Sequence, residues 1–284
     1  MSSAAVVPVP RQRPSYLKAF GGLLLRDLYV LRREIAPFLI RVAMNPLLFL
    51  FVFTYVMPHM SGAAAAASPA ARMAGMGGGG FGTVLLPGLM AVAIMFSGIA
   101  AVALPLATEF GITREIDDRV MSPLPIEGVA LEKIVFSAAQ SLVAAGIVYP
   151  LAYYIPSTPV QAHVTSWPFL FLVLVLGSLV SGALGLTIGT SVQPKQIGLI
   201  FGVVVVPITF LGCVYYPWAA LTHIRWLQYA VLVNPIVYIS EGLRAALTPG
   251  MGHMPDALLL GMLVFFFALL TWLGMRGFRR RVVS

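Results

Sequence analysis

Six long apolar runs limit the fold of this chain more than any other feature of its sequence. They cover residues 36–57, 83–108, 131–155, 168–190, 196–217 and 255–275. A helix needs roughly 20 mostly apolar residues to cross a bilayer, and each run has about that length. Only 10% of the residues are charged, against about 25% in a typical soluble domain. The sequence therefore predicts an all-α integral membrane protein with six transmembrane helices.

Lys and Arg residues are divided unevenly between the two predicted sides of the membrane. An even number of spans places both chain ends on one side. That side holds fifteen of the basic residues, whereas the other side holds Arg72, Arg225 and Arg244. Basic residues accumulate on the cytoplasmic side of membrane proteins, so both termini are predicted to lie in the cytoplasm and the protein in the cytoplasmic (inner) membrane. Topology and attraction to membrane lipids then explain the net charge of +8, and no nucleic acid partner is expected.

The predicted spans are flanked by segments of different character. Residues 1–14 are rich in proline and are expected to be disordered. Residues 15–35 predict an amphipathic helix at the cytoplasmic interface, because apolar residues recur at steps of three and four. These apolar positions are Leu17, Phe20, Leu24, Leu28, Leu31 and Ile35. The six-span domain then covers residues 36–275, and residues 276–284 form a basic cytoplasmic tail.

Residues 217–247 predict an external helical hairpin before the last span. Asn234 and Pro235 interrupt the chain and can start a new helix, with Asn as its N-cap and Pro in its first turn. Glu241 and Arg244 are three residues apart on that helix and can pair. We expect the hairpin to dip into the outer leaflet and return, shielded by protein or by a water-filled cavity.

The sequence lacks the residues that would supply energy or catalysis within the chain. Its three lysines, Lys18, Lys133 and Lys195, follow Leu, Glu and Pro, so no GxxxxGK[ST] phosphate-binding loop is present. No ionisable residue lies near the middle of a predicted span, which disfavours a carrier driven by protons or sodium. No catalytic residue, metal site or cofactor is predicted. If the protein moves a substrate uphill, another chain must supply the energy.

The loop between the second and third runs is the one dense group of charges. Its sequence, EFGITREIDDRVMSPLPIEG at residues 109–128, contains seven of the 28 charged residues. Helix-compatible residues continue to Met121, and Pro123 and Pro125 end them. A short helix that carries both signs of charge is suited to specific docking with a soluble partner. A solvated connecting loop is the alternative.

Several motifs together resemble the permease subunit of type-2 ATP-binding-cassette (ABC) exporters. They are an amphipathic helix before the first span, LLPGLM at 85–90, EFGITREIDDRVMSPLP from 109, VYYPWAAL from 214 and NPIVYISEGLR at 234–244. The resemblance implies a homodimer that binds a separate ABC ATPase subunit, and ATP is bound by that subunit. It also implies that loop 109–128 is the coupling helix. The implied ATPase-coupling residues are Glu109, Arg114, Glu115, Asp117, Asp118 and Arg119.

Aromatic residues at the ends of the first and fifth spans indicate a possible translocation path. These are Phe49, Phe51, Phe53, Tyr55, Tyr215 and Tyr216. Aromatic faces can hold sugars or flat amphipaths, although such residues also pack against lipid. The expected function is ATP-driven export of an amphipathic, drug-like, lipid-linked or saccharide substrate. The alternatives are a lipid-modifying membrane enzyme, using external Glu241, Arg244, His223 and His253, or a membrane anchor that transports nothing.

Overall fold

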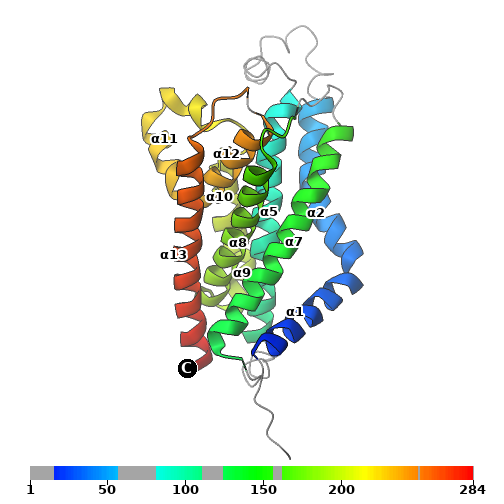
Figure 1. Cartoon of the computed structure of the whole chain (residues 1–284), viewed down its shortest axis with the longest axis vertical. Helices are drawn as coiled ribbons and strands as arrows, with labels where there is room; N and C mark the ends of the chain where they lie inside the picture. Colours follow the sequence, from blue (N-terminus) through cyan, green and yellow to red (C-terminus); the bar gives the residue numbers. More distant parts are fainter. Residues whose placement is uncertain (1–15, 57–80, 111–123, 156–161, 249, 284) are drawn as a thin grey trace, which may run out of the picture.

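The computed structural model describes residues 16–56, 81–110, 124–155, 162–248 and 250–283. These residues form a bundle of helices, and no strand occurs in the described part of the chain (Figure 1). The longer elements are α1 (Tyr16–Arg33), α2 (Ile35–Leu50), α5 (Phe81–Thr108), α7 (Ile126–Tyr154), α8 (Trp167–Ser191), α12 (Pro235–Leu247) and α13 (Asp256–Val283). The shorter ones are η1 (Phe51–Val56), η4 (Pro194–Gln196), α9 (Ile197–Ile200), η5 (Phe201–Val205), α10 (Val206–Phe210), η6 (Trp218–His223), α11 (Arg225–Ala230) and η7 (Val231–Val233). The predicted all-helical class is confirmed.

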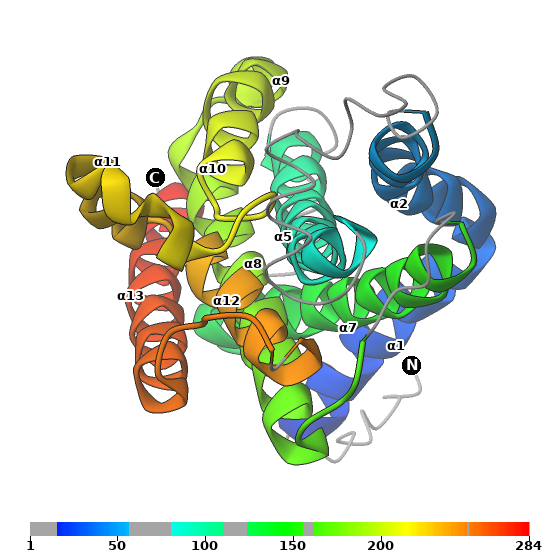
Figure 2. The same ribbon diagram turned by 90° about the horizontal axis from the view of Figure 1, so that it is seen from above.

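Helix α5 lies at the centre of the bundle. It packs against α7, α8 and α12, and α13 packs on the outside against α8 (Figure 2). Most of α5 is buried inside the chain, whereas most of α13 is not. The first helix, α1, runs obliquely across the end of the bundle where the C-terminus lies, and it contains no buried residue (Figure 1). Both α1 and α2 contact α7.

Small residues let α8 approach its neighbours closely, as the glycine and serine stripe in its sequence indicates. A Cβ atom added at Gly185 would lie 3.0 Å from the Cα and carbonyl oxygen of Ile99 in α5. At Gly182 it would lie 3.1 Å from the carbonyl oxygen of Ile134 in α7. Such distances leave no room for a side chain. Close contact between backbones is how helices in membranes gain packing energy without a hydrophobic driving force.

Four helices of the described residues are long and apolar enough to cross a membrane: α5, α7, α8 and α13. They correspond to the predicted spans 83–108, 131–155, 168–190 and 255–275. A fifth candidate is the pair Arg225–Val233 and Pro235–Leu247, which is bent by 100°. The predicted count of six spans is therefore not confirmed.

The first and fifth predicted spans are shorter or interrupted. Helix α2 contains Pro46 and continues into a π-helix, η1. The fifth span, predicted at 196–217, consists of the short segments η4, α9, η5 and α10, and η5 is again a π-helix. Proline removes a backbone donor, and wide π-turns occur frequently at functional sites. The π-helices distinguish these two segments from α5 and α7, which also contain prolines but are continuous α-helices over their ranges.

Candidate coupling and translocation sites

The charged loop begins and ends at well-packed positions. Five of its predicted coupling residues lie in 111–123, outside the described residues: Arg114, Glu115, Asp117, Asp118 and Arg119. The sixth, Glu109, directly follows α5. Glu109 is only 5% exposed within the chain. It lies at the start of the loop, and its coupling role stays a prediction.

Glu109 forms an ion pair with the next helix along the chain. Its Oε1 atom lies 2.8 Å from Nζ of Lys133 in α7, and both side chains are buried. Glu132, beside Lys133, is fully buried as well. Removing one member of a buried pair strands the other charge and costs about 3 to 5 kcal/mol. The pair therefore joins the end of α5 to the first turns of α7. Segment 111–123 lies between these two helices in the chain.

The last helix also contacts the start of the loop. The rings of Phe110 and Phe278 meet edge to face with centroids 5.9 Å apart. The guanidinium of Arg281 lies 5.4 Å from the centroid of Phe110 and donates to the carbonyl of Val192 at the end of α8. Cations stabilise helix C-termini, where backbone carbonyls lack partners. The sequence predicted Arg281 only as part of the basic tail. Its contact with Val192 joins distant parts of the chain, so no local sequence pattern indicates it.

Some of the predicted path residues come together in the structure. Phe49 of α2 and Tyr215 have ring centroids 5.3 Å apart, and Tyr215 also contacts Phe210 of α10 at 5.6 Å. Phe51 and Tyr55 stack on each other at 5.4 Å, and both are more than 40% exposed. Tyr216 is half-buried. The side chain of Phe53 lies outside the described residues. The first and fifth predicted spans therefore meet through aromatic rings.

The start of α12 follows the sequence prediction. The Asn234 side chain accepts a hydrogen bond of 3.1 Å from the backbone N–H of Ile236, and Pro235 occupies the first turn. The amide of Asn234 also donates to the carbonyl of Ile208 at 2.6 Å. The predicted N-cap is confirmed, and the same residue ties α12 to α10.

Glu241 and Arg244 pair as their spacing predicts, and both are completely buried. Glu241 also accepts a hydrogen bond of 2.9 Å from the backbone N–H of Trp218. Arg244 donates to the carbonyl of Cys213 at 3.1 Å. These contacts hold α12 against the turn after α10. Because the two charged groups are enclosed, they do not form the accessible polar cluster that a lipid-modifying enzyme requires.

The turn that receives Arg244 has an unusual backbone. Cys213 has a φ of 51°, a left-handed value that is uncommon for residues other than glycine. Gly88 of α5 lies directly against the carbonyl of Val214, where a Cβ atom would collide. The sequence did not indicate these roles for Cys213 or Gly88, since each depends on a contact between distant segments.

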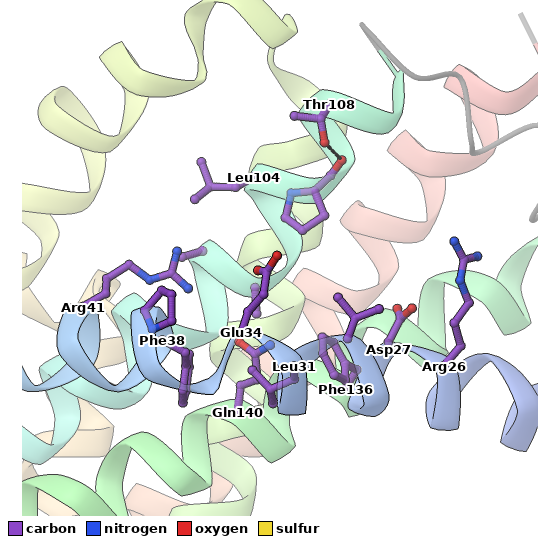
Figure 3. A pocket seen from close by; sticks show the side chains of 15 residues that line it. Arg26, Asp27, Leu31, Glu34, Phe38, Arg41, Leu104, Thr108, Phe136 and Gln140 are labelled. Carbon is purple, nitrogen blue, oxygen red and sulfur yellow. Dashed lines mark hydrogen bonds between the residues drawn. The ribbon is translucent and has the colours of Figure 1, made fainter.

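Two cavities between α2 and α5 were also not anticipated. The larger, of about 730 Å³, is lined by α1, α2, α5 and α7 (Figure 3). The smaller, of about 350 Å³, lies between α2, α5 and η5, and most of its lining is apolar. Both cavities border the first predicted span, and the smaller one also borders the fifth through Phe201. This is a second place where the structure could hold a small molecule.

A family model for the ABC-2 type transporter matches residues 20–248. The matched region begins in α1 and ends directly after α12, so it contains the Glu109–Lys133 pair, the aromatic contacts and the α12 anchor. No curated protein matches the chain. The match covers well over half of the sequence, and the apolar helices make it a multi-pass membrane protein. The chain belongs to the ABC-2 type transporter family and is a transmembrane permease of an ABC transporter.

Proposed function

We propose that the protein is the permease of an ATP-driven exporter in the cytoplasmic membrane, with both termini in the cytoplasm. Two copies bind two copies of a separate ATPase subunit. The substrate is an amphipathic, drug-like, lipid-linked or saccharide compound that leaves the cell. Family membership supports the requirement for an ATP-binding partner, and the distribution of Lys and Arg supports the orientation.

The observation that carries the proposal is the buried Glu109–Lys133 ion pair. In the proposed mechanism, the ATPase subunit contacts the charged residues between 111 and 123. A displacement of that segment reaches α5 and α7 together, because the ion pair joins their ends on either side of the segment. Phe110, packed on Phe278, extends the connection to α13.

The proposed movement is transmitted to the first and fifth predicted spans. Helix α5 contacts α2, η1 and α9, which belong to these spans. The spans are interrupted by π-helices, and Phe49 and Tyr215 touch across them. Separating these rings would open an aromatic-lined path, and aromatic faces accept amphipaths and sugars without selecting one charge.

Co-purification tests this proposal. The tagged permease is expressed with the P-loop ATPase encoded nearest to it, and the complex is isolated in detergent and reconstituted into vesicles. We expect one ATPase subunit per permease chain and ATP hydrolysis that increases when an exported amphipath is added. Transport by the permease alone, or a permease that binds no ATPase, contradicts the proposal.

A further inference from the structure

Arg41 lies where two cavities meet. It lines both the larger cavity at the α1–α2 junction and the smaller apolar cavity deeper along α5, and Ala100 and Leu104 line both as well. The volumes of about 730 and 350 Å³ both lie within the range of roughly 300 to 1,000 Å³ typical of small-molecule sites. A single elongated molecule that passes Arg41 can thus occupy both cavities.

The wall of the larger cavity has an ordered series of charges. Arg41 is nearest to the apolar cavity, Glu34 follows seven residues before it, and Asp27 and Arg26 lie farther out (Figure 3). The side chains of Arg41 and Glu34 are directed from the α1–α2 segment toward α5 (Figure 3). Within the part of the chain that the structure describes, neither of the two has an ion-pair partner. The series therefore fits a ligand with an anionic group near its apolar part and a cationic group farther out.

One buried hydroxyl in the lining of the apolar cavity lacks a hydrogen-bond partner. Ser97 of α5 lines it, is 6% exposed, and its hydroxyl has no hydrogen-bond partner among the described residues. Several buried hydroxyls nearby do have partners: Ser137 donates to the carbonyl of Ile134 at 2.7 Å, and Ser181 to that of Ser178 at 2.8 Å. A buried hydroxyl without a partner costs free energy, which a ligand acceptor would recover.

We propose that these cavities bind a zwitterionic phospholipid from the leaflet on the side of α1. Its phosphate pairs with Arg41, and its amine, one step farther from the tail, pairs with Glu34. Ser97 donates to an ester carbonyl of the glycerol, and one acyl chain lies against Val92, Phe96 and Phe201. This order matches the order of groups along such a lipid. This assignment goes beyond the proposed export function, and its tests do not require the exported compound or the ATPase.

The first test compares head groups on the unaltered protein. Lipid adducts are counted by native mass spectrometry of delipidated protein in detergent, titrated with phosphatidylethanolamine, phosphatidylcholine or phosphatidylglycerol of the same chains. We expect phosphatidylethanolamine to bind about tenfold more tightly than phosphatidylglycerol, because the charge-assisted bond to Glu34 needs an ammonium donor. Phosphatidylcholine lacks N–H donors and should bind between the two. Equal binding of all three lipids overturns the proposal.

Charge variants assign the two ends of the head group. Arg41→Gln should weaken binding of all three lipids about tenfold, since each has a phosphate. Glu34→Gln should abolish the preference for phosphatidylethanolamine and leave phosphatidylglycerol unaffected. Arg33→Gln is the matched control, because Arg33 is exposed on the neighbouring turn and does not line the cavity. If Arg41→Gln binds the lipids as tightly as Arg33→Gln does, the proposed lipid site is wrong.

Ser97→Ala tests the position of the ester. This variant should weaken binding of ester-linked phosphatidylethanolamine several-fold but should not affect the ether-linked analogue, which lacks the carbonyl acceptor. Ser178→Ala is the control, because Ser178 is another buried hydroxyl without a partner in the described part of the chain and does not line the cavity. If Ser97→Ala loses the same affinity for the ester and the ether lipid, the assignment of Ser97 is wrong. It is also wrong if Ser178→Ala loses as much affinity for the ester lipid as Ser97→Ala does.

Discussion

Lys133 and Glu109 are 24 residues apart, yet their side chains meet at 2.8 Å and join the two helix ends that flank residues 111–123. Both groups are buried, so the attraction between them is weakly screened by salt. The pair therefore holds together the two helices that precede and follow the charged segment. The proposed coupling mechanism depends on this connection.

Exchanging the two charges should show whether the attraction between opposite charges, and not the particular side chains, stabilises this contact. Lys133→Glu puts a second carboxylate beside Glu109, and we expect a loss of stability of about 3 to 5 kcal/mol. The double variant Glu109→Lys/Lys133→Glu should recover most of that loss. Stability is measured as the fraction of protein that remains monodisperse in detergent after heating.

Lys195→Glu provides the control for charge reversal, because Lys195 is exposed in η4. It should leave the stability nearly unchanged. A double variant that is no more stable than Lys133→Glu would show that the ion pair does not join the two helices.

Charge reversal within the loop should separate ATP hydrolysis from transport. The variant Glu115→Lys/Asp118→Lys retains the apolar spans, so we expect normal membrane insertion and a folded permease. Transport in vesicles that contain the ATPase should fall at least tenfold, as expected when charges at a docking surface are opposed. Full transport by this variant would refute the coupling role of the loop.

Gly185 should tolerate no larger residue, because α8 and α5 touch there. Gly185→Leu forces the two backbones apart, and overpacking of this kind costs about 1 to 3 kcal/mol or more. Gly261→Leu is the matched control, since a Cβ atom on Gly261 of α13 would meet nothing within 4 Å. Thermal unfolding of both variants should show a large decrease only for Gly185→Leu.

The stability of the protein should depend on whether one or both charges of the buried Glu241–Arg244 pair are removed. Arg244→Met leaves the carboxylate of Glu241 without its cation, so we expect strong destabilisation, of about 3 to 5 kcal/mol. Adding Glu241→Gln removes that charge and keeps an acceptor for the N–H of Trp218, so stability should partly return. Arg225→Met, at an exposed position, should have little effect. A double variant less stable than Arg244→Met would contradict this account.

Features set by local sequence were predictable. The long apolar runs produced α5, α7, α8 and α13, and the Asn234–Pro235 cap and the Glu241–Arg244 pair depend on residues a few positions apart. In each case the spacing along one helix determines the contact.

Contacts between distant segments were not predictable in the same way. Glu109–Lys133, Arg281 on Val192 and the cavities around Arg41 depend on how helices pack, and no periodicity along the chain encodes them. The interruptions near Pro46 and Pro207 have a related cause. Proline frees backbone carbonyls, but neighbouring helices decide whether the chain kinks, widens or breaks.

The most direct test of the central claim follows the fifth predicted span while the ATPase works. A spin label at Leu199→Cys is suitable because Leu199 is 66% exposed in α9 and the native Cys213 is buried. The distance between the labels of the two permease copies is measured in the complex, first without nucleotide and then with ATP and vanadate. We expect this distance to change in the unaltered complex and to stay constant in the assembled Glu115→Lys/Asp118→Lys complex. Equal changes in both complexes would contradict transmission of the work through the charged loop.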